Sequence, residues 1–211
     1  MDSLCAPAPA LQDKIWCCGA GTAGDTEAVT GNIESQLELH RMATGKALRV
    51  VTAVTYLKRH LFKYQGNVSA ACVLGGVDVT GPHLYCVYPH GSVDKLPYAA
   101  MGSGSLAAMA LFETKYKADM TLEEAMALCT EAVKHGIDND TGSGGNIDLM
   151  VITPEGHTHH RNIVKPNERK YKRNYHFPVG TTTVLSEKFT PLSSLVTVET
   201  EVQPTGAMEI G

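Results

Sequence analysis

The spacing of apolar residues along the chain predicts four helices. Val29, Ile33 and Leu37 recur every fourth residue, which places them on one face of a helix that ends at about Ala43. Thr22 or Asp25 is the predicted N-cap of this helix, since either side chain is a competent cap. Similar spacing predicts helices over about 47–64, 102–117 and 121–136. The sequence Thr-Leu-Glu-Glu at 121–124 is a capping box, and it marks the start of the last helix.

Shorter apolar runs bounded by turn residues predict the strands. These runs cover 14–18, 69–75, 84–88, 98–101, 147–153, 158–163 and 181–185. Residues 1–13 are expected to be irregular, and residues 190–211 are expected to form an extended arm because they lack a helical period. The predicted helices arrive in pairs between groups of strands, an order that favours a layered α+β sandwich over a doubly wound parallel sheet.

Composition mainly excludes classes of function. The net charge of −4 offers no general field for nucleic acid, and the basic run at 165–173 is local. No apolar run has the length of a membrane span, and the N-terminus lacks the pattern of a signal peptide. We therefore expect a cytoplasmic or nuclear protein with no membrane partner.

The cysteines and histidines do not predict a metal site. Cys72, Cys86 and Cys129 lie inside apolar patterns and are expected to be buried thiols, and no CxxC pair indicates zinc. On a strand, His157 and His159 would share one face while the neighbouring His160 points to the other. At most two imidazoles could then meet one ion, so an exposed hairpin is the preferred interpretation.

The glycine-rich turn at 19–24 carries the main chemical signal. It spells GxGxxG between a strand and a helix, which is the pattern of dinucleotide-binding turns. Such a fold needs an acidic residue at the end of the next strand, but no Asp or Glu occurs between Glu38 and Asp78. A nucleotide-binding protein therefore stays an alternative that would require measurable dinucleotide affinity. The same turn, followed by a helix N-terminus, also suits the oxyanion of an acyl transfer.

Two further glycine clusters occur at 102–104 and 140–145, and each could be no more than a tight turn. If the two clusters converge, the Ser103 and Ser143 hydroxyls and the Asp140 carboxylate would form a hydrogen-bond network. Such a network is useful around a charged amine or a nucleophile.

Five segments taken together closely resemble the beta subunits of the eukaryotic 20S proteasome, in particular the trypsin-like beta-2 class. They are residues 15–23, 74–78, 88–92, 101–105 and 143–148. The resemblance covers about 14–211 and implies the N-terminal-nucleophile hydrolase fold, a four-layer sandwich with two antiparallel sheets between helix layers. It divides the chain into a divergent segment (1–13), a beta-type domain (14–189) and a C-terminal arm (190–211).

The resemblance also implies partners and residue roles. The partners are other alpha and beta subunits in stacked rings and peptide substrates cleaved after basic residues, and no cofactor is implied. Gly21 matches the glycine whose N–H forms the oxyanion hole. The matched residues that support the nucleophile are Ser103, Asp140 and Ser143, and those that bind substrate are Gly19, Ala23 and Glu27.

One departure from the family pattern concerns the nucleophile, which in this family is a threonine whose free α-amino group acts as the base. The matching position would fall upstream of Met1, and the position of the active-site lysine falls on Pro7. We therefore expect the chain as written to lack its nucleophile and the first strands of the sandwich, and to be inactive. The alternative is a non-catalytic structural or assembly-competing ring subunit.

Overall fold

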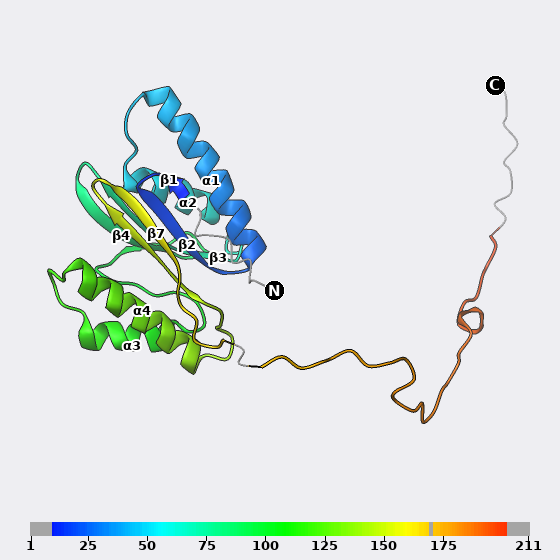
Figure 1. Ribbon diagram of the computed structural model, residues 1–211. Helices are drawn as coiled ribbons and strands as arrows, with labels where there is room; N and C mark the ends of the chain where they lie inside the picture. The colour runs from blue at the N-terminus through cyan, green and yellow to red at the C-terminus, as the bar shows by residue number, and fades with distance from the viewer. Residues whose placement is uncertain (1–9, 169–170, 202–211) are drawn as a thin grey trace, which may run out of the picture. The chain divides into compact units, whose positions relative to one another are not determined.

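The computed structural model of the chain describes residues 10–168 and 171–201. The chain divides into two units between Glu168 and Arg169, and each is described by itself. Among the described residues, all four α-helices and all seven strands lie in the first unit (Figure 1).

The four predicted helices are present. They are α1 (Ala23–Thr44), α2 (Val50–Lys63), α3 (Ser105–Lys115) and α4 (Leu122–Asn139). Gly45 ends α1 in a left-handed conformation, and its N–H donates to the Arg41 carbonyl. The predicted stop of α4 at Gly136 is wrong, because Gly136 is a buried packing position inside the helix. A Cβ added at Gly104 would lie 3.2 Å from the Gly136 Cα, so the two glycines allow a close approach.

The capping box at the start of α4 forms as predicted. The Thr121 hydroxyl accepts from the Glu124 N–H at 3.3 Å, and the Glu124 carboxylate accepts from the Thr121 N–H at 2.9 Å.

We expect Thr121→Ala to lower the free energy of unfolding by about 1 kcal/mol, because it leaves an N–H of the first turn without its acceptor. Urea denaturation followed by circular dichroism measures the change. Glu123→Ala is the control, since no cap bond uses that side chain. An equal loss in both variants would contradict the capping role.

The strands form two antiparallel sheets. A five-stranded sheet has the order β1 (Ala10–Gln12), β2 (Ile15–Gly21), β3 (Ala70–Asp78), β4 (Gly81–Val87) and β5 (Val93–Lys95). The second sheet is the hairpin of β6 (Ile147–Thr153) and β7 (Gly156–Val164). In β2 and β3, Gly21 lies opposite Ala70 and Gly19 opposite Cys72, which sets the end of β2 against the start of β3.

In the first unit, the structure differs from the strand predictions at three places. Residues 10–12, expected to be irregular, pair with β2 as β1. The strand predicted at 98–101 is absent, and Val93–Lys95 pairs with β4 instead. Tyr98 packs against Phe112 and Tyr116, with ring centroids 5.7 and 4.6 Å apart, so this apolar run belongs to a helical core.

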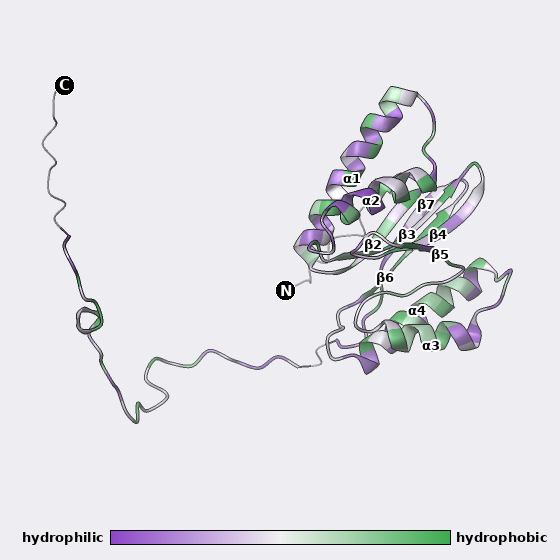
Figure 2. Ribbon diagram, turned by 180° about the vertical axis from the view of Figure 1, so that it is seen from behind, coloured by the Kyte–Doolittle hydropathy of each residue, from purple (hydrophilic) through white to green (hydrophobic). Residues whose placement is uncertain are grey.

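Helices and sheets stack in layers (Figures 1 and 2). Helices α1 and α2 contact β3 across a core that includes Ile33, Leu57 and Leu74. A smaller core between α3 and α4 includes Phe112 and Leu128, and α4 contacts β6. The fold is thus α+β, consistent with the predicted sandwich of two antiparallel sheets between helix layers.

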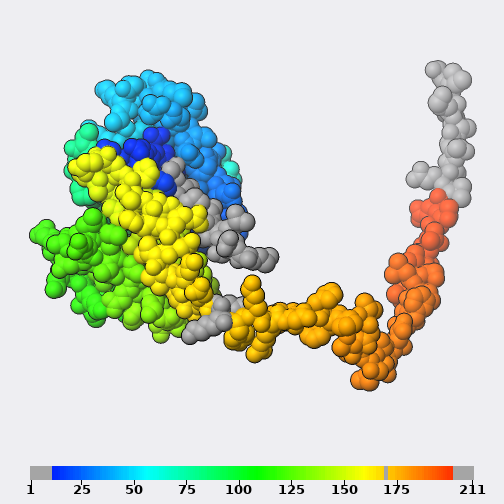
Figure 3. Space-filling view, viewed as in Figure 1, coloured from blue at the N-terminus to red at the C-terminus, as the bar shows by residue number. Residues whose placement is uncertain are grey.

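The two sheets contact one another where β2, β3 and the residue before β2 meet the β6–β7 hairpin. The Trp16 and His157 ring centroids lie 4.8 Å apart, and a Cβ built on Gly75 would lie 4.0 Å from the Ile152 Cδ1. The Lys14 ammonium donates to the Pro154 carbonyl in the β6–β7 turn. Many β7 side chains are exposed, and Figure 3 shows this strand in yellow on the surface of the first unit.

In the second unit, residues 171–201 contain one short 3-10 turn at Leu192–Ser194, and all of them are exposed. The strand predicted at 181–185 is wrong, because these residues pair with no strand of the described chain. The predicted boundary between 189 and 190 stays a prediction. The helices of the described residues all fall short of the length and apolar character that a membrane span requires.

The thiols predicted to be buried behave in two ways. Cys72 and Cys86 are buried as predicted, whereas Cys129 is half-buried. All cysteines of the described residues are free thiols. Burial raises the pKa of the Cys86 and Cys129 thiols, so both stay protonated at neutral pH.

Candidate functional site

The turn after β2 is held from two sides. Gly21 has φ +106°, and a Cβ at this position would clash with the Ser69 carbonyl oxygen. The same carbonyl accepts from the Thr22 N–H at 3.0 Å. The Asp25 carboxylate, one turn into α1, accepts from the Ser69 N–H at 2.9 Å. Ser69 therefore connects the start of β3 to both the turn and the helix.

The start of α1 presents its backbone at this turn. Thr22 is the N-cap, one of the two predicted caps, but its side chain makes no capping hydrogen bond. Asp25 lies in the first turn, where a negative charge complements the helix dipole, and it binds Ser69 instead of acting as the cap. The helix thus points a positive dipole end at the Gly21 turn.

Ser103, Asp140 and Ser143 form the hydrogen-bond network that the sequence predicts. The Ser103 and Ser143 hydroxyls donate to the same Asp140 carboxylate oxygen at 2.5 and 2.6 Å. The other oxygen accepts from the Gly142 N–H at 3.1 Å. The hydrogen bonds from Ser103, Ser143 and Gly142, in that order of effect, hold the pKa of Asp140 below its ordinary value. The carboxylate is therefore ionised at neutral pH.

Close glycine contacts bring this network to the end of β2. Gly102 has φ +101°, and a Cβ built on it would lie 3.5 Å from the Ala20 Cβ, one residue before Gly21. On the network side, a Cβ at Gly104 would lie 3.0 Å from the Ser143 hydroxyl oxygen. Ser103 sits between these two glycines. The structure therefore places Ser103, Asp140 and Ser143 beside the Gly21 end of β2.

The three predicted substrate-binding residues lie around the start of α1. Gly19 is exposed near the end of β2, and any Cβ there would clash with the Thr26 methyl group. Ala23 and Glu27 are exposed on the first turns of α1. Gly19 therefore leaves the end of β2 without a protruding side chain. The exposed Glu27 carboxylate lies on the neighbouring helix α1. Their roles in substrate binding stay predictions.

Sequence reasoning missed Ser69 and Thr26. Ser69 follows the loop after α2, and nothing in its local pattern links it to a turn 48 residues earlier. Thr26 faces Gly19 only because β2 folds back onto α1. The only sequence signal is Asp25, which the sequence predicts as a possible helix cap.

Two histidines of the patch at 157–160 lie beside carboxylates. His157 Nδ1 lies 3.1 Å from the Asp13 carboxylate, and His159 Nε2 lies 3.8 Å from Asp148. Each imidazole therefore has its own carboxylate neighbour from another segment. His157 is exposed, as the exposed-hairpin interpretation expects, whereas His159 is partly buried, at 22% side-chain exposure.

We expect Asp140→Asn to speed amide hydrogen exchange across 140–145 several-fold, since the amide has one acceptor oxygen and cannot serve both the two serine hydroxyls and the Gly142 N–H, which use different oxygens of the carboxylate. Lowering the pH should have a similar effect on the parent. The lowered pKa means that the network is intact above the ordinary Asp range and is lost as the pH falls below it. Asp138→Asn, an exposed position in α4, is the matched control. Unchanged exchange in Asp140→Asn would contradict the network's role in holding the turn.

Comparison with known proteins agrees with this architecture. Residues 9–152 match the family model described as proteasome subunit. A proteasome subunit beta type-7 from Dictyostelium discoideum is 57% identical over 199 residues, covering 94% of this chain and 75% of that protein. A proteasome subunit beta type-2 from Saccharomyces cerevisiae is 50% identical over 188 residues, covering 88% and 72%.

A proteasome subunit beta type-10 from Mus musculus is 46% identical over 210 residues, covering 99% of this chain and 76% of that protein. These relatives confirm the resemblance seen in the sequence, including its beta-2 character. The chain therefore belongs to the proteasome subunit family, as one of its beta-type members.

Proposed function

We propose that this chain, a beta-ring subunit of the 20S proteasome core, uses the Gly21 end of β2 to bind the acyl group of peptide substrates. One observation carries the proposal, which is the Ser103–Asp140–Ser143 network lying against β2 next to the Gly21 turn. In this proposal the Gly21 N–H and the α1 N-terminus stabilise the negative oxygen of an acyl intermediate. The ring partners are other alpha and beta subunits, in the cytoplasm and nucleus.

The substrates in this proposal carry a basic side chain next to the cleaved bond. Gly19 leaves room beside the turn, and the exposed Glu27 carboxylate supplies the opposite charge for a lysine or arginine. The Asp140 carboxylate lies on the network side and adds a second negative charge near the amine of a bound nucleophile. The product is a cleaved peptide, which fits a role in protein degradation.

The described residues around Gly21 do not include a hydroxyl with an effective base. The Ser103 and Ser143 hydroxyls both donate to Asp140, whose lowered pKa makes it a weak proton acceptor. We therefore propose that hydrolysis needs a nucleophile from outside the described residues, and that the 211-residue chain by itself leaves such peptides uncleaved. The pairing of both serine hydroxyls with Asp140 also supports the second candidate, a non-catalytic or assembly-competing ring subunit.

The test purifies 20S particles from cells that make this chain, sequences its N-terminus and assays a fluorogenic peptide with arginine before the cleaved bond. A threonine at the mature terminus together with arginine-peptide cleavage would support the catalytic role. A Met1 terminus within particles would support the non-catalytic one. Absence from the particles would overturn the ring assignment, and cleavage by the isolated 211-residue chain would overturn the requirement for an outside nucleophile.

A further inference from the structure

The direction of the Gly21 N–H follows from the pairing of β2 with β3. Thr22 donates its N–H to the Ser69 carbonyl at 3.0 Å, so these two residues are a hydrogen-bonded pair of the antiparallel ladder. Such pairs alternate with pairs that exchange no hydrogen bond, and the next pair is Gly21 with Ala70. In agreement with this, the Ala70 N–H donates to the Val68 carbonyl. The Gly21 N–H therefore points away from β3.

The other side of β2 is open at this end of the strand. Among the described residues, β1 pairs with β2 only at Ile15 and Trp16, which lie at the opposite end. The Gly21 N–H is thus directed out of the edge of the sheet. This is the side on which the proposed function needs a donor for the negative oxygen of an acyl intermediate.

Ser69 lacks the acceptor that a regular ladder would give it. In a hydrogen-bonded pair the Ser69 N–H would donate to the Thr22 carbonyl, but α1 begins here and that carbonyl accepts from the Thr26 N–H at 3.0 Å and from its hydroxyl at 3.1 Å. The Asp25 carboxylate is the acceptor instead, at 2.9 Å from the Ser69 nitrogen. Asp25 therefore completes the last pair of the ladder at the point where β2 turns into α1.

The Ser69 backbone is in this way held on both sides. Asp25 binds its N–H, and the Thr22 N–H binds its carbonyl oxygen. The same oxygen would lie 2.4 Å from a Cβ built on Gly21, so Ser69 is in close contact with the Gly21 backbone. Asp25 is half-buried on α1, whereas Gly24 and Glu27 beside it are exposed. A shift of Ser69 would move the Gly21 N–H as well.

We propose that Asp25 is a positioning residue for the acyl-transfer chemistry at Gly21. By binding the Ser69 N–H, it fixes the Ser69 carbonyl and through it the backbone that aims the Gly21 N–H at the negative oxygen. Asp25 acts through its acceptor oxygen and not through its charge, because a negative charge near a developing oxyanion raises the energy of that oxyanion. The role rests on the function proposed above, since it belongs to the same reaction.

Steady-state kinetics test this role in 20S particles that are purified through a tag on the full chain. The substrate is a fluorogenic peptide with arginine before the cleaved bond. Asp25→Ala should lower kcat about tenfold and change KM by less than about twofold. The reason is that a misaimed N–H weakens binding of the transition state more than binding of the substrate.

Asp25→Asn separates the acceptor from the charge. The asparagine amide oxygen can still accept from the Ser69 N–H, so this variant should keep about half of the parent kcat or more. If the carboxylate charge were the important property, Asp25→Asn and Asp25→Ala would lose kcat equally. Co-migration of each variant with 20S particles verifies assembly before the rates are compared.

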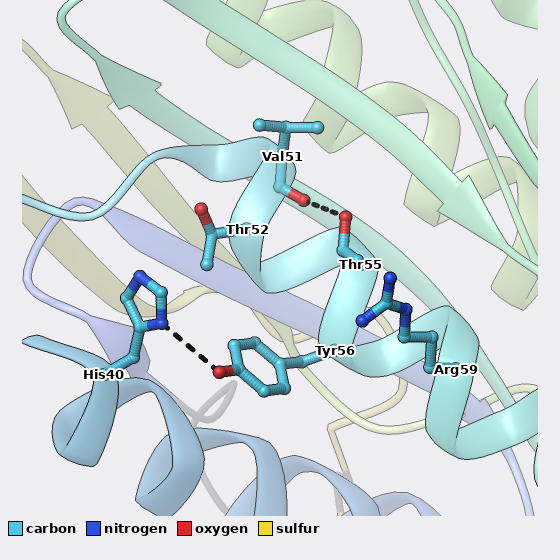
Figure 4. Close-up of a pocket in the computed structure, with 6 residues that line it drawn as sticks. All are labelled: His40, Val51, Thr52, Thr55, Tyr56 and Arg59. Atoms are coloured by element: carbon cyan, nitrogen blue, oxygen red, sulfur yellow. Dashed lines mark hydrogen bonds between the residues drawn. The ribbon is translucent and has the colours of Figure 1, made fainter.

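Tyr56→Phe is the distant control, because it removes a different hydrogen bond between α1 and its surroundings. His40 Nδ1 lies 3.2 Å from the Tyr56 hydroxyl, beside a pocket of about 260 Å³ between α1 and α2 (Figure 4). His40 lies about 22 Å from Asp25 along the axis of α1. We therefore expect Tyr56→Phe to leave kcat unchanged.

A double-mutant comparison tests the positioning without catalysis, in the isolated 211-residue chain. Gly21→Ala should raise the unfolding equilibrium constant about 150-fold in the parent. In the Asp25→Ala background the Ser69 carbonyl can move away from the new methyl group. The same substitution should then raise the constant only about 20-fold. Equal effects in the two backgrounds would mean that Asp25 does not hold Ser69 against Gly21.

The two measurements distinguish the role of Asp25 from the proposed function. If parent particles leave the arginine peptide uncleaved, the proposed catalytic role of the chain fails, and the double-mutant comparison still decides whether Asp25 holds the turn. If the parent cleaves the peptide, three results would each overturn the role of Asp25. These are equal losses of kcat in Asp25→Ala and Asp25→Asn, an effect on KM alone, and a loss of kcat in Tyr56→Phe that matches Asp25→Ala.

Discussion

Gly21→Ala is expected to lower the free energy of unfolding by about 3 kcal/mol. The residue sits at φ +106°, a conformation that alanine rarely adopts, and the added methyl group would clash with the Ser69 carbonyl oxygen. That oxygen cannot retreat easily, because it accepts from the Thr22 N–H and belongs to the residue that Asp25 holds. The strain would therefore spread to both β3 and α1. Chemical denaturation followed by tryptophan fluorescence reports the change, since Trp16 lies on the same strand.

Gly24→Ala is the matched control for Gly21→Ala. It adds the same methyl group three residues later, where no atom lies within 4 Å of the new Cβ and the backbone is helical. We expect the free energy of unfolding of this variant to rise by up to about 0.5 kcal/mol, because alanine loses less backbone entropy than glycine on entering a helix. Opposite signs for the two variants would show that the turn itself requires glycine. If Gly21→Ala left the free energy of unfolding unchanged, the turn would not be rigid.

The helices could be predicted from sequence because their signals are local. The four-residue spacing of Val29, Ile33 and Leu37 and the Thr121 capping box are both complete within one or two turns of helix. The strands were harder to predict, because a short apolar run does not show which other strand it pairs with. Residues 98–101 and 181–185 have similar apolar character, yet the first packs beside α3 and the second has no pairing strand among the described residues.

The candidate site was predictable in its residues and not in its geometry. The resemblance to a known family gave Ser103, Asp140 and Ser143, and the structure joins them by hydrogen bonds. The approach of Gly102 to Ala20 depends on how α3 lies against the sheet, which no sequence spacing encodes. The Asp25–Ser69 bond likewise spans 44 residues, so it exists only once β2 and β3 have paired in register.

Asp78→Ala is expected to lower the free energy of unfolding by about 3 kcal/mol, because the carboxylate joins three parts of the fold. One oxygen accepts from the Val50 N–H at 2.9 Å and so caps α2 from the β3–β4 turn. The other accepts from the Thr80 N–H at 2.8 Å and lies 3.3 Å from His83 Nε2. Removing it would leave the buried Val50 N–H without its acceptor, and the His83 Nε2 would keep only the Thr80 hydroxyl, at 2.7 Å. Asp94→Asn, at an exposed carboxyl on the neighbouring β5, is the control and should stay close to the parent.

Asp78→Asn separates the charge of this carboxylate from its shape. Burial by itself would raise the pKa of Asp78, but the hydrogen bonds from Thr80 and Val50, together with His83, outweigh it and lower the pKa from 3.8 to about 2. A lowered pKa in the folded state stabilises the protein above the ordinary Asp range, and the stabilisation is lost as the pH falls toward 2. The shift corresponds to about 2 kcal/mol at neutral pH, of which about half should be gone by pH 3. Urea titrations from pH 7 to pH 3 should therefore show a shrinking difference in free energy of unfolding between the parent and Asp78→Asn. A constant difference across this range would mean that the ionised carboxylate does not hold α2 to the β3–β4 turn.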